Sequence, residues 1–300
     1  MPRSIAIVAT LFCTLLATVS AQITTAVVAP PKDEVQRLKL SPFYKQYLSA
    51  NGFPIVASQK VSPLALKEAR YLIDKMLEGR EDIRQRLTRN KVRFAIMAVD
   101  EMTTAIPEHS DLKPAKYWDR RARGLGATKH RPAVSCGEEN LLRLPGDPYW
   151  QESLLIHEFA HAIHKMAVRE LDETFDQRLQ DAYRSAIKAG LWKGKYAGSN
   201  ADEYWAEGVQ SWFDDNRPPD HDHNHVNTRK ELQAYDPTLA KLVEEVFGRR
   251  DWRYQKPADR PMQERLHLET LEPKTVKRFQ WPDGLEEWYR EYMKKKAKRR

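Results

Sequence analysis

Two histidines and a glutamate stand together in the segment His157-Glu158-Phe159-Ala160-His161. On a helix, residues four apart lie one turn apart on the same face, so both imidazoles can point at one metal ion. Glu158 lies about 100° round the helix from His157, near that ion but free to act on a bound water. The segment therefore predicts two zinc ligands, His157 and His161, and a general base, Glu158.

The alternative is a core helix whose histidines are satisfied by hydrogen bonds, because most residues around the motif are apolar: Leu154, Leu155, Ile156, Phe159 and Ile163. Burying two histidines and a glutamate together is costly unless they have a partner. This cost favours a metal site.

A catalytic zinc site needs a third protein ligand. One extension of the motif has Gly three residues after the second His, followed by His or Asp, but His164 and Ala167 occupy those positions. We therefore look to a later segment, Glu203-Tyr204-Trp205-Ala206-Glu207, whose two glutamates lie one turn apart. Glu203 is expected to bind the metal, and Glu207 to orient a ligand histidine from behind.

Glu203 also has a purely structural interpretation. Asn200-Ala201-Asp202-Glu203 has the pattern of a helix capping box, in which the Glu side chain returns to the start of the helix. Tyr196 lies shortly before it in a turn flanked by Gly194 and Gly198. A phenol there can donate a hydrogen bond to a developing oxyanion.

The motif at 157–161, the interval from Tyr196 to Glu203 and the segment at 203–207 together resemble the gluzincin metallopeptidases, in the lineage of anthrax lethal factor and Pro-Pro endopeptidase. The resemblance covers about residues 150–215. It implies zinc ligation by His157, His161 and Glu203, acid and base work by Glu158, and oxyanion stabilisation by Tyr196. It also implies a zincin-like domain, helix-dominated α+β with a small sheet and an active-site helix that carries the motif.

Other candidate residues have simpler interpretations. His221, His223 and His225 lie in one polar segment that is either an exposed loop or part of a cleft rim, and His225 is the one expected to face substrate. Cys136 is interpreted as a small, partly buried residue, although a thiolate is also a good zinc ligand. His164 is expected to be a core histidine.

The elements that must position these residues follow from periodicity. Helices are predicted over 63–77 and 80–87, and a buried strand over 92–99. The region 100–149 is rich in Gly and Pro and is expected to be a long functional loop region. Further helices are predicted over 151–169, 172–189, 201–213, 228–234 and 238–247.

The ends of the chain differ from its body. Arg3, the apolar run over 5–19 and the small residues before Gln22 predict a signal peptide over 1–21, too short to remain as a membrane span. A linker is expected over 22–40, one catalytic domain over 41–290 and a basic tail over 291–300. The localisation expected is secreted or periplasmic.

Charge excludes one class of partner. The net charge is +8, but it comes mainly from the basic tail, and basic and acidic residues nearly balance in the rest of the chain. A nucleic-acid enzyme needs a basic face along its whole footprint. We therefore expect no nucleic-acid partner, and we interpret the tail as a solvated helix end.

The expected function is hydrolysis of peptide bonds with Zn²⁺ as cofactor and a peptide or protein as substrate. Two alternatives remain open at this point. The same site could act on a non-peptide amide, an ester or a glycan-linked group, because the ligands do not specify what binds above them. The chain could also be a non-catalytic binding module that carries zinc.

Overall fold

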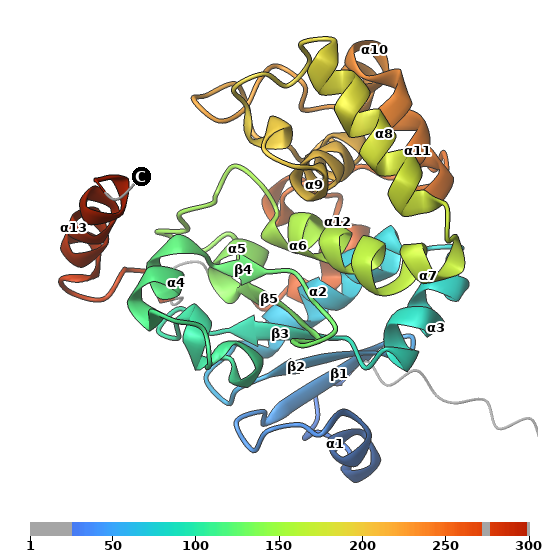
Figure 1. Ribbon diagram of the computed structural model, residues 1–300. Helices are drawn as coiled ribbons and strands as arrows, with labels where there is room; N and C mark the ends of the chain where they lie inside the picture. The colour runs from blue at the N-terminus through green and yellow to red at the C-terminus, as the bar shows by residue number, and fades with distance from the viewer. Residues whose placement is uncertain (1–25, 272–276, 299–300) are drawn as a thin grey trace, which may run out of the picture.

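The structure is a computed structural model that describes residues 26–271 and 277–298. The expected signal peptide, 1–21, lies outside the described residues. The described chain is α+β: helices dominate, and one small mixed sheet lies in the lower half of the view in Figure 1. The coarse fold class predicted from sequence is thereby confirmed.

The sheet has five strands in the order β1-β2-β3-β5-β4. The strands are β1 (Gln46–Ala50), β2 (Phe53–Ala57), β3 (Arg93–Met97), β4 (Gly124–Leu125) and β5 (Ala133–Gly137). β2, β3 and β5 run parallel, whereas β1 and β4 are antiparallel to their neighbours and form the two edges. Every residue of β2, β3 and β5 is buried, as expected for inner strands covered on both faces.

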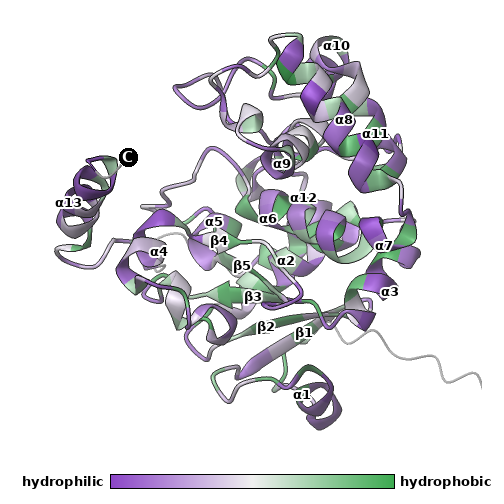
Figure 2. Ribbon diagram, in the orientation of Figure 1, coloured by the Kyte–Doolittle hydropathy of each residue, from purple (hydrophilic) through white to green (hydrophobic). Residues whose placement is uncertain are grey.

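Helices cover one face of this sheet. α2 (Pro63–Met76) and α3 (Glu81–Arg89) contact β1 and β2, and α6 (Leu154–Ile163) lies along β5 and β4. α1 (Lys32–Leu38) lies beneath the other face in Figure 1. Figure 2 shows hydrophobic residues concentrated in the inner strands and polar residues on the outward sides of the helices.

A second, wholly helical part lies above α6 (Figure 1). α9 (Ala201–Trp212) packs directly on α6, and its neighbours pack around it in turn. These neighbours are α8 (Phe175–Lys188), α10 (Arg229–Tyr235) and α11 (Pro237–Phe247). Trp205 and Trp212 of α9 are fully buried and form part of the core.

The remaining elements are short or peripheral. They are α4 (Ala115–Arg121), α5 (Glu138–Leu142), the π-helix η3 (His164–Val168), α7 (Arg169–Leu171), α12 (Met262–Arg265), α13 (Leu285–Ala297) and the 3₁₀ turns η1 (Thr103–Ala105), η2 (Pro107–His109), η4 (Tyr196–Gly198), η5 (Pro257–Asp259) and η6 (Leu266–Leu268). No helix in the described parts of the chain combines the length and the apolar character needed to cross a bilayer.

Two expectations differ from the structure, and a third agrees with it. The region 100–149 is not one long loop, because it contains α4, β4, β5 and α5. The described part of the expected linker, 22–40, is ordered: it contains α1, and Val28 forms a β-bridge with Tyr47. The interpretation of the basic tail as a helix end agrees with the described residues, since the last turn of α13 carries Lys294, Lys295 and Lys296.

Candidate metal centre

The motif 157–161 lies on α6, a helix that has no cap of its own. Ser153 precedes α6 but makes no side-chain capping bond. The free backbone groups at this end are satisfied from elsewhere: the Leu154 N–H donates to Asn140 Oδ1 at 2.8 Å, and the Ser153 N–H donates to the Asp215 carboxylate at 2.9 Å. These two bonds satisfy backbone donors that the start of a buried helix would otherwise leave unpaired.

α9 presents the glutamate. Asn200 caps this helix, since its Oδ1 accepts from the backbone N–H groups of Asp202 and Glu203 at 2.9 and 3.0 Å. The Glu203 side chain does not return to close a capping box. Its carboxylate points across to α6 instead, where Oε2 lies 3.1 Å from His157 Nε2.

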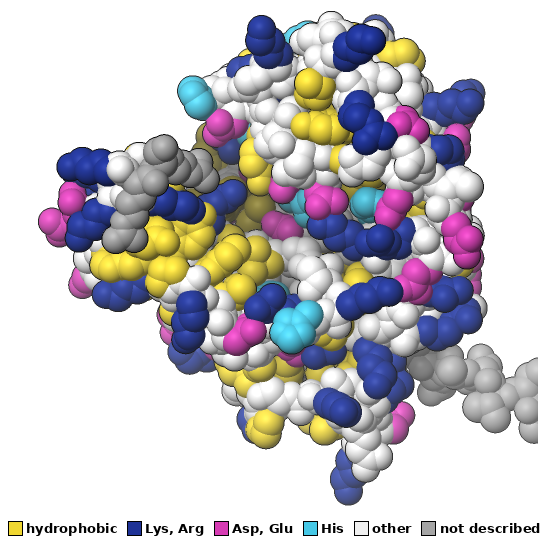
Figure 3. All heavy atoms as spheres, viewed as in Figure 1, with side chains coloured by type: hydrophobic (Ala, Val, Ile, Leu, Met, Phe, Trp, Pro, Cys, Tyr) yellow, Lys and Arg dark blue, Asp and Glu magenta, His cyan; other side chains and the backbone are white. Residues whose placement is uncertain are grey.

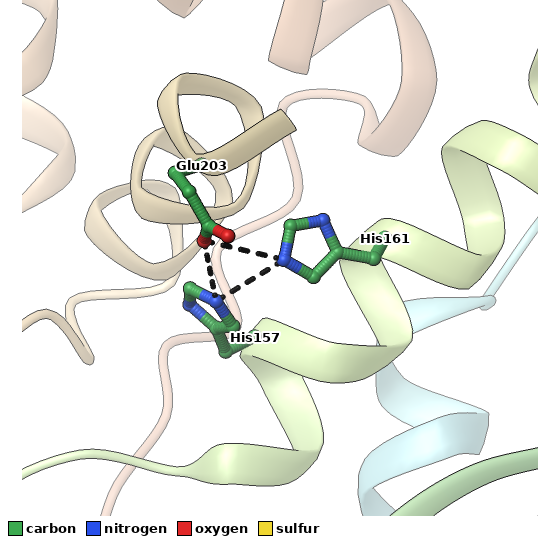
Figure 4. Close-up of side chains that lie close together, drawn as sticks. All are labelled: His157, His161 and Glu203. Carbon is green, nitrogen blue, oxygen red and sulfur yellow. Dashed lines mark hydrogen bonds and ion pairs between the residues drawn. The ribbon is translucent and has the colours of Figure 1, made fainter. Parts of the chain in front are cut away.

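Three donor atoms converge between α6 and α9 (Figure 4). The Nε2 atoms of His157 and His161 are 3.2 Å apart, and Glu203 Oε2 lies 3.1 Å from the first and 3.4 Å from the second. Two ligands of a tetrahedral zinc ion, each about 2.1 Å from it, are separated by about 3.4 Å. The spacing of the three donors fits such an ion.

The tautomer of His157 also fits. Gln210 donates through Nε2 to the Glu152 carboxylate at 3.0 Å, which fixes the orientation of its amide. Its Oε1 lies 2.7 Å from His157 Nδ1 and can only accept, so Nδ1 carries the proton. In a neutral imidazole this leaves the lone pair on Nε2, directed at His161 and Glu203, as metal binding requires.

Electrostatics around His157 and Glu203 favours positive charge. Burial would lower the pKa of His157, but its hydrogen bond with Glu203 and the charge of Glu158 outweigh burial and raise it. For Glu203, burial would raise the pKa, but hydrogen bonds with His157 and His161 hold it far below its usual range. The negative charge of Glu203 and Glu158 therefore stabilises a cation placed among these groups.

The edge strand β4 passes very close to α6. A Cβ atom added at Gly126 would lie 2.8 Å from His161 Cβ, and one added at Gly124 would lie 2.9 Å from Glu158 Cγ. Neither glycine has a left-handed backbone, so close approach alone explains the residue type. The two glycines bring β4 against the face of α6 that carries the motif.

Glu158 lines the cleft beside the ligands and makes no hydrogen bond to another described residue. Burial raises the pKa of its carboxyl above the usual value, while the charges of His157 and His161 act in the opposite direction. A carboxylate in this position is available to a water in the cleft.

Tyr196 lies on η4 with its ring roughly stacked on that of His157, 6.3 Å between centroids. Its backbone N–H donates to Asp222 O at 2.7 Å, which ties the turn to the histidine-containing loop. Burial and the charge of Glu203 raise the pKa of Tyr196, so the phenol keeps its proton at neutral pH. The Arg121 guanidinium interacts with the Tyr196 hydroxyl and opposes this rise in its pKa.

Glu207 is close to His157 but is not its main support. Its Oε1 lies 3.7 Å from His157 Nδ1, an ion-pair distance, whereas Gln210 makes the hydrogen bond. Its Oε2 faces His223 Nε2 at 3.4 Å. Gln210 was not among the predicted site residues, although it lies about one turn beyond Glu207 on α9.

Glu152, Glu207 and His223 form a second buried group of possible metal-binding atoms behind the first. Charged residues outside the group also contact it. His223 also pairs with Asp220 at 3.0 Å, and Arg217 lies 3.7 Å from Glu152. Burial, followed by the charge of Glu207, raises the pKa of Glu152.

The other candidate residues lie apart from the three donors. His225 does not line the cleft and packs instead against Tyr235, so the expectation that it faces substrate is wrong; His223 is the member that lines it. His164 is buried and pairs with Asp176 at 2.7 Å. Cys136 is fully buried on the inner strand β5, and burial raises the pKa of its thiol.

The candidate centre lies in a cleft of about 800 Å³. Figure 3 shows histidine and acidic side chains in this hollow between the sheet and the helical part, with a hydrophobic area beside it beneath the C-terminal helix. Aromatic residues of α4 and α13 line that side: Tyr117, Trp118 and Tyr289. The cleft is large enough for a peptide segment.

A scan against models of protein families finds none that matches this sequence. A search of curated proteins likewise finds no match. The interpretation of the site therefore depends on the chemistry and geometry of its residues.

Proposed function

We propose that this chain is a zinc-dependent metallopeptidase of the gluzincin type, which hydrolyses peptide bonds in the cleft between the sheet and α9. The convergence of His157, His161 and Glu203 beside the free carboxylate of Glu158 carries the proposal. A site that only stored zinc would need neither Glu158 nor Tyr196. Export of the chain is part of the proposal and rests on the sequence of residues 1–21.

Zinc held by His157, His161 and Glu203 would polarise the scissile carbonyl and lower the pKa of a bound water to about 7. Glu158 accepts a proton from the attacking water and passes it to the leaving amine. Tyr196, kept as a phenol by its raised pKa, donates a hydrogen bond where negative charge develops on the carbonyl oxygen. Gln210 keeps His157 in the tautomer that binds metal.

The test combines a peptide library with two variants. The zinc-loaded protein is incubated with peptides derived from a proteome, and the cleaved bonds are identified by mass spectrometry. Glu158→Gln should retain zinc and lose turnover by about 10²–10⁴-fold, the usual contribution of a general base. Tyr196→Phe should lower kcat with little change in zinc content.

A Glu158→Gln protein that cleaves as fast as the parent would overturn the mechanism. Cleavage of esters or glycan-linked groups, with no peptide cleaved, would instead favour the same site acting on another substrate class. One zinc per chain with no hydrolysis of any of these compounds would favour a binding module.

A further inference from the structure

Cationic side chains in the cleft fall into two kinds. Most are paired with a carboxylate: Lys165 with Asp202 at 2.7 Å, Arg120 with Glu286 at 2.6 Å and Arg123 with Glu139 at 2.6 Å, and Arg217 with Asp220. Arg121 also lines the cleft, but none of the described residues offers it a carboxylate within ion-pair distance. It is the cleft cation whose charge is left for a ligand.

Arg121 stands at the end of α4, where the chain turns towards β4. Its side chain is exposed and lines the cleft together with Tyr196, whose hydroxyl interacts with the guanidinium and raises its pKa. Tyr196 in turn stacks on the ring of His157, so Arg121, Tyr196 and a candidate metal ligand line one cleft. A guanidinium has five N–H donors, and one phenol oxygen occupies few of them.

We propose that Arg121 selects substrates that carry a carboxylate within about two residues of the cleaved bond, an inference that rests on the proposed peptidase function. The planar guanidinium matches a carboxylate in two parallel hydrogen bonds. Glu158 and Glu203 would repel a substrate carboxylate in the cleft. The one unpaired cation, Arg121, offsets this repulsion for a single negative charge. The carboxylate is either an acidic side chain or the C-terminus of the substrate.

A different role for Arg121 would be to position Tyr196. A residue acting only through Tyr196 would change kcat for every substrate by the same factor. A residue that binds a substrate carboxylate changes the ratio between acidic and neutral substrates. The two roles are therefore separated by a ratio measured on matched peptides.

The experiment uses the zinc-loaded full chain and peptides taken from its own cleavage screen. Each peptide is made with Glu or Gln at the enriched acidic position, and with a free or an amidated C-terminus. We expect kcat/KM to be about tenfold or more higher for the member with the carboxylate, typical of a charged hydrogen bond. The arm in which the preference appears identifies the source of the carboxylate.

In Arg121→Gln the ratio between acidic and neutral peptides should fall to about one, and Arg121→Lys should restore part of it. Arg120→Gln is the matched control, from the neighbouring position on α4, and should keep the ratio because Arg120 is already paired with Glu286. Isothermal titration calorimetry of the same peptides with Glu158→Gln, and with the double variant that also carries Arg121→Gln, measures binding without turnover. The preference for the acidic peptide should be present in the first protein and lost in the second.

The inference is overturned if the parent protein cleaves both members of each pair equally, if Arg121→Gln keeps the ratio, or if Arg120→Gln abolishes it to the same extent. Failure of the proposed function has another signature, since then no peptide in the library is cleaved by the zinc-loaded parent protein. Circular dichroism and zinc content check that each variant is folded.

Discussion

The imidazole of His157 is held at both of its nitrogens. Nε2 faces His161 and Glu203, and Nδ1 donates to Gln210, whose amide is fixed in turn by Glu152. By contrast, Nδ1 of His161 is buried with no hydrogen-bond partner among the described residues. The two histidines therefore differ in how firmly their rings are oriented, and the orientation of His157 depends on Gln210.

This asymmetry gives a prediction for zinc affinity. Replacing Gln210 by Leu removes the acceptor behind His157, and loss of such a partner usually weakens metal binding about 10–100-fold. We expect the apparent zinc dissociation constant of Gln210→Leu, measured by competition with a chelator, to rise within this range. Lys165→Gln, at the cleft rim, is the control, and an unchanged affinity in Gln210→Leu would contradict the assigned role.

Much of the site could be predicted from the sequence because its residues lie at short, regular intervals. Helical spacing places His157 beside His161, and the later Glu203 is the third donor that converges on them. Gln210 was not predicted. Glu207 and Gln210 lie on the same face of α9, and side-chain packing decides which of them reaches His157. Arg121 was not predicted either, since only the fold brings α4 next to Tyr196.

At the scale of elements, the start of α6 depends on residues from other segments. Asn140 of α5 accepts from Leu154 N and donates through Nδ2 to Asp147 at 3.0 Å and to Glu152 O at 2.9 Å. The side chain is almost fully buried. A single asparagine thus satisfies backbone and side-chain groups at the end of the helix that carries the motif.

Asn140→Ala should therefore be strongly destabilising. It leaves buried donors and acceptors unpaired, and the expected loss in the free energy of unfolding is about 3 kcal/mol. Urea denaturation followed by circular dichroism measures it. Gln177→Ala is the control: its bond to Asp181 is exposed on α8, so its stability should change by no more than about 0.5 kcal/mol. Equal effects of the two replacements would argue against this role of Asn140.

Elements with a strong periodic pattern were predicted well. The helix expected over 63–77 is α2, and the strand expected over 92–99 contains β3. β1 and β2 were missed, although Asn51-Gly52 between them is a sequence typical of a tight hairpin and both residues have positive φ. β4 has only two residues, so period-two alternation could not identify it.

On the scale of the whole molecule, the cleft lies where the sheet with α6 meets the helical part built around α9 (Figure 1). Each part supplies a share of the candidate ligands, so the site depends on the packing of both.

A buried histidine outside the cleft makes the stability of the whole molecule depend on pH. His109 is 1% exposed, and its Nε2 lies 3.1 Å from Ser135 Oγ.

Burial lowers the pKa of His109 to about 4, while Glu108 raises it and Arg131 lowers it by smaller amounts. Between pH 6.5 and pH 4 the unfolded chain therefore binds a proton at this residue that the folded chain does not. His109 should cost the folded state up to about 3 kcal/mol as the pH falls through this window, and nothing above it.

Urea denaturation of the parent protein and of His109→Gln, each at pH 7 and at pH 5, tests this pH dependence. The replacement should reduce the loss of stability between the two pH values, even if it destabilises the protein at both. His130→Gln, at an exposed position, should leave the difference as it is in the parent protein. An unaltered pH dependence in His109→Gln would show that other groups produce it.

The central claim is that His157, His161 and Glu203 hold one zinc ion, and metal analysis of the purified protein tests it most directly. Inductively coupled plasma mass spectrometry should find one zinc per folded chain in the parent protein and in Glu158→Gln. His161→Ala and Glu203→Ala should lose most of it while keeping their circular dichroism spectra. A folded parent protein that binds no zinc, or zinc retained in full by His161→Ala, would contradict the account.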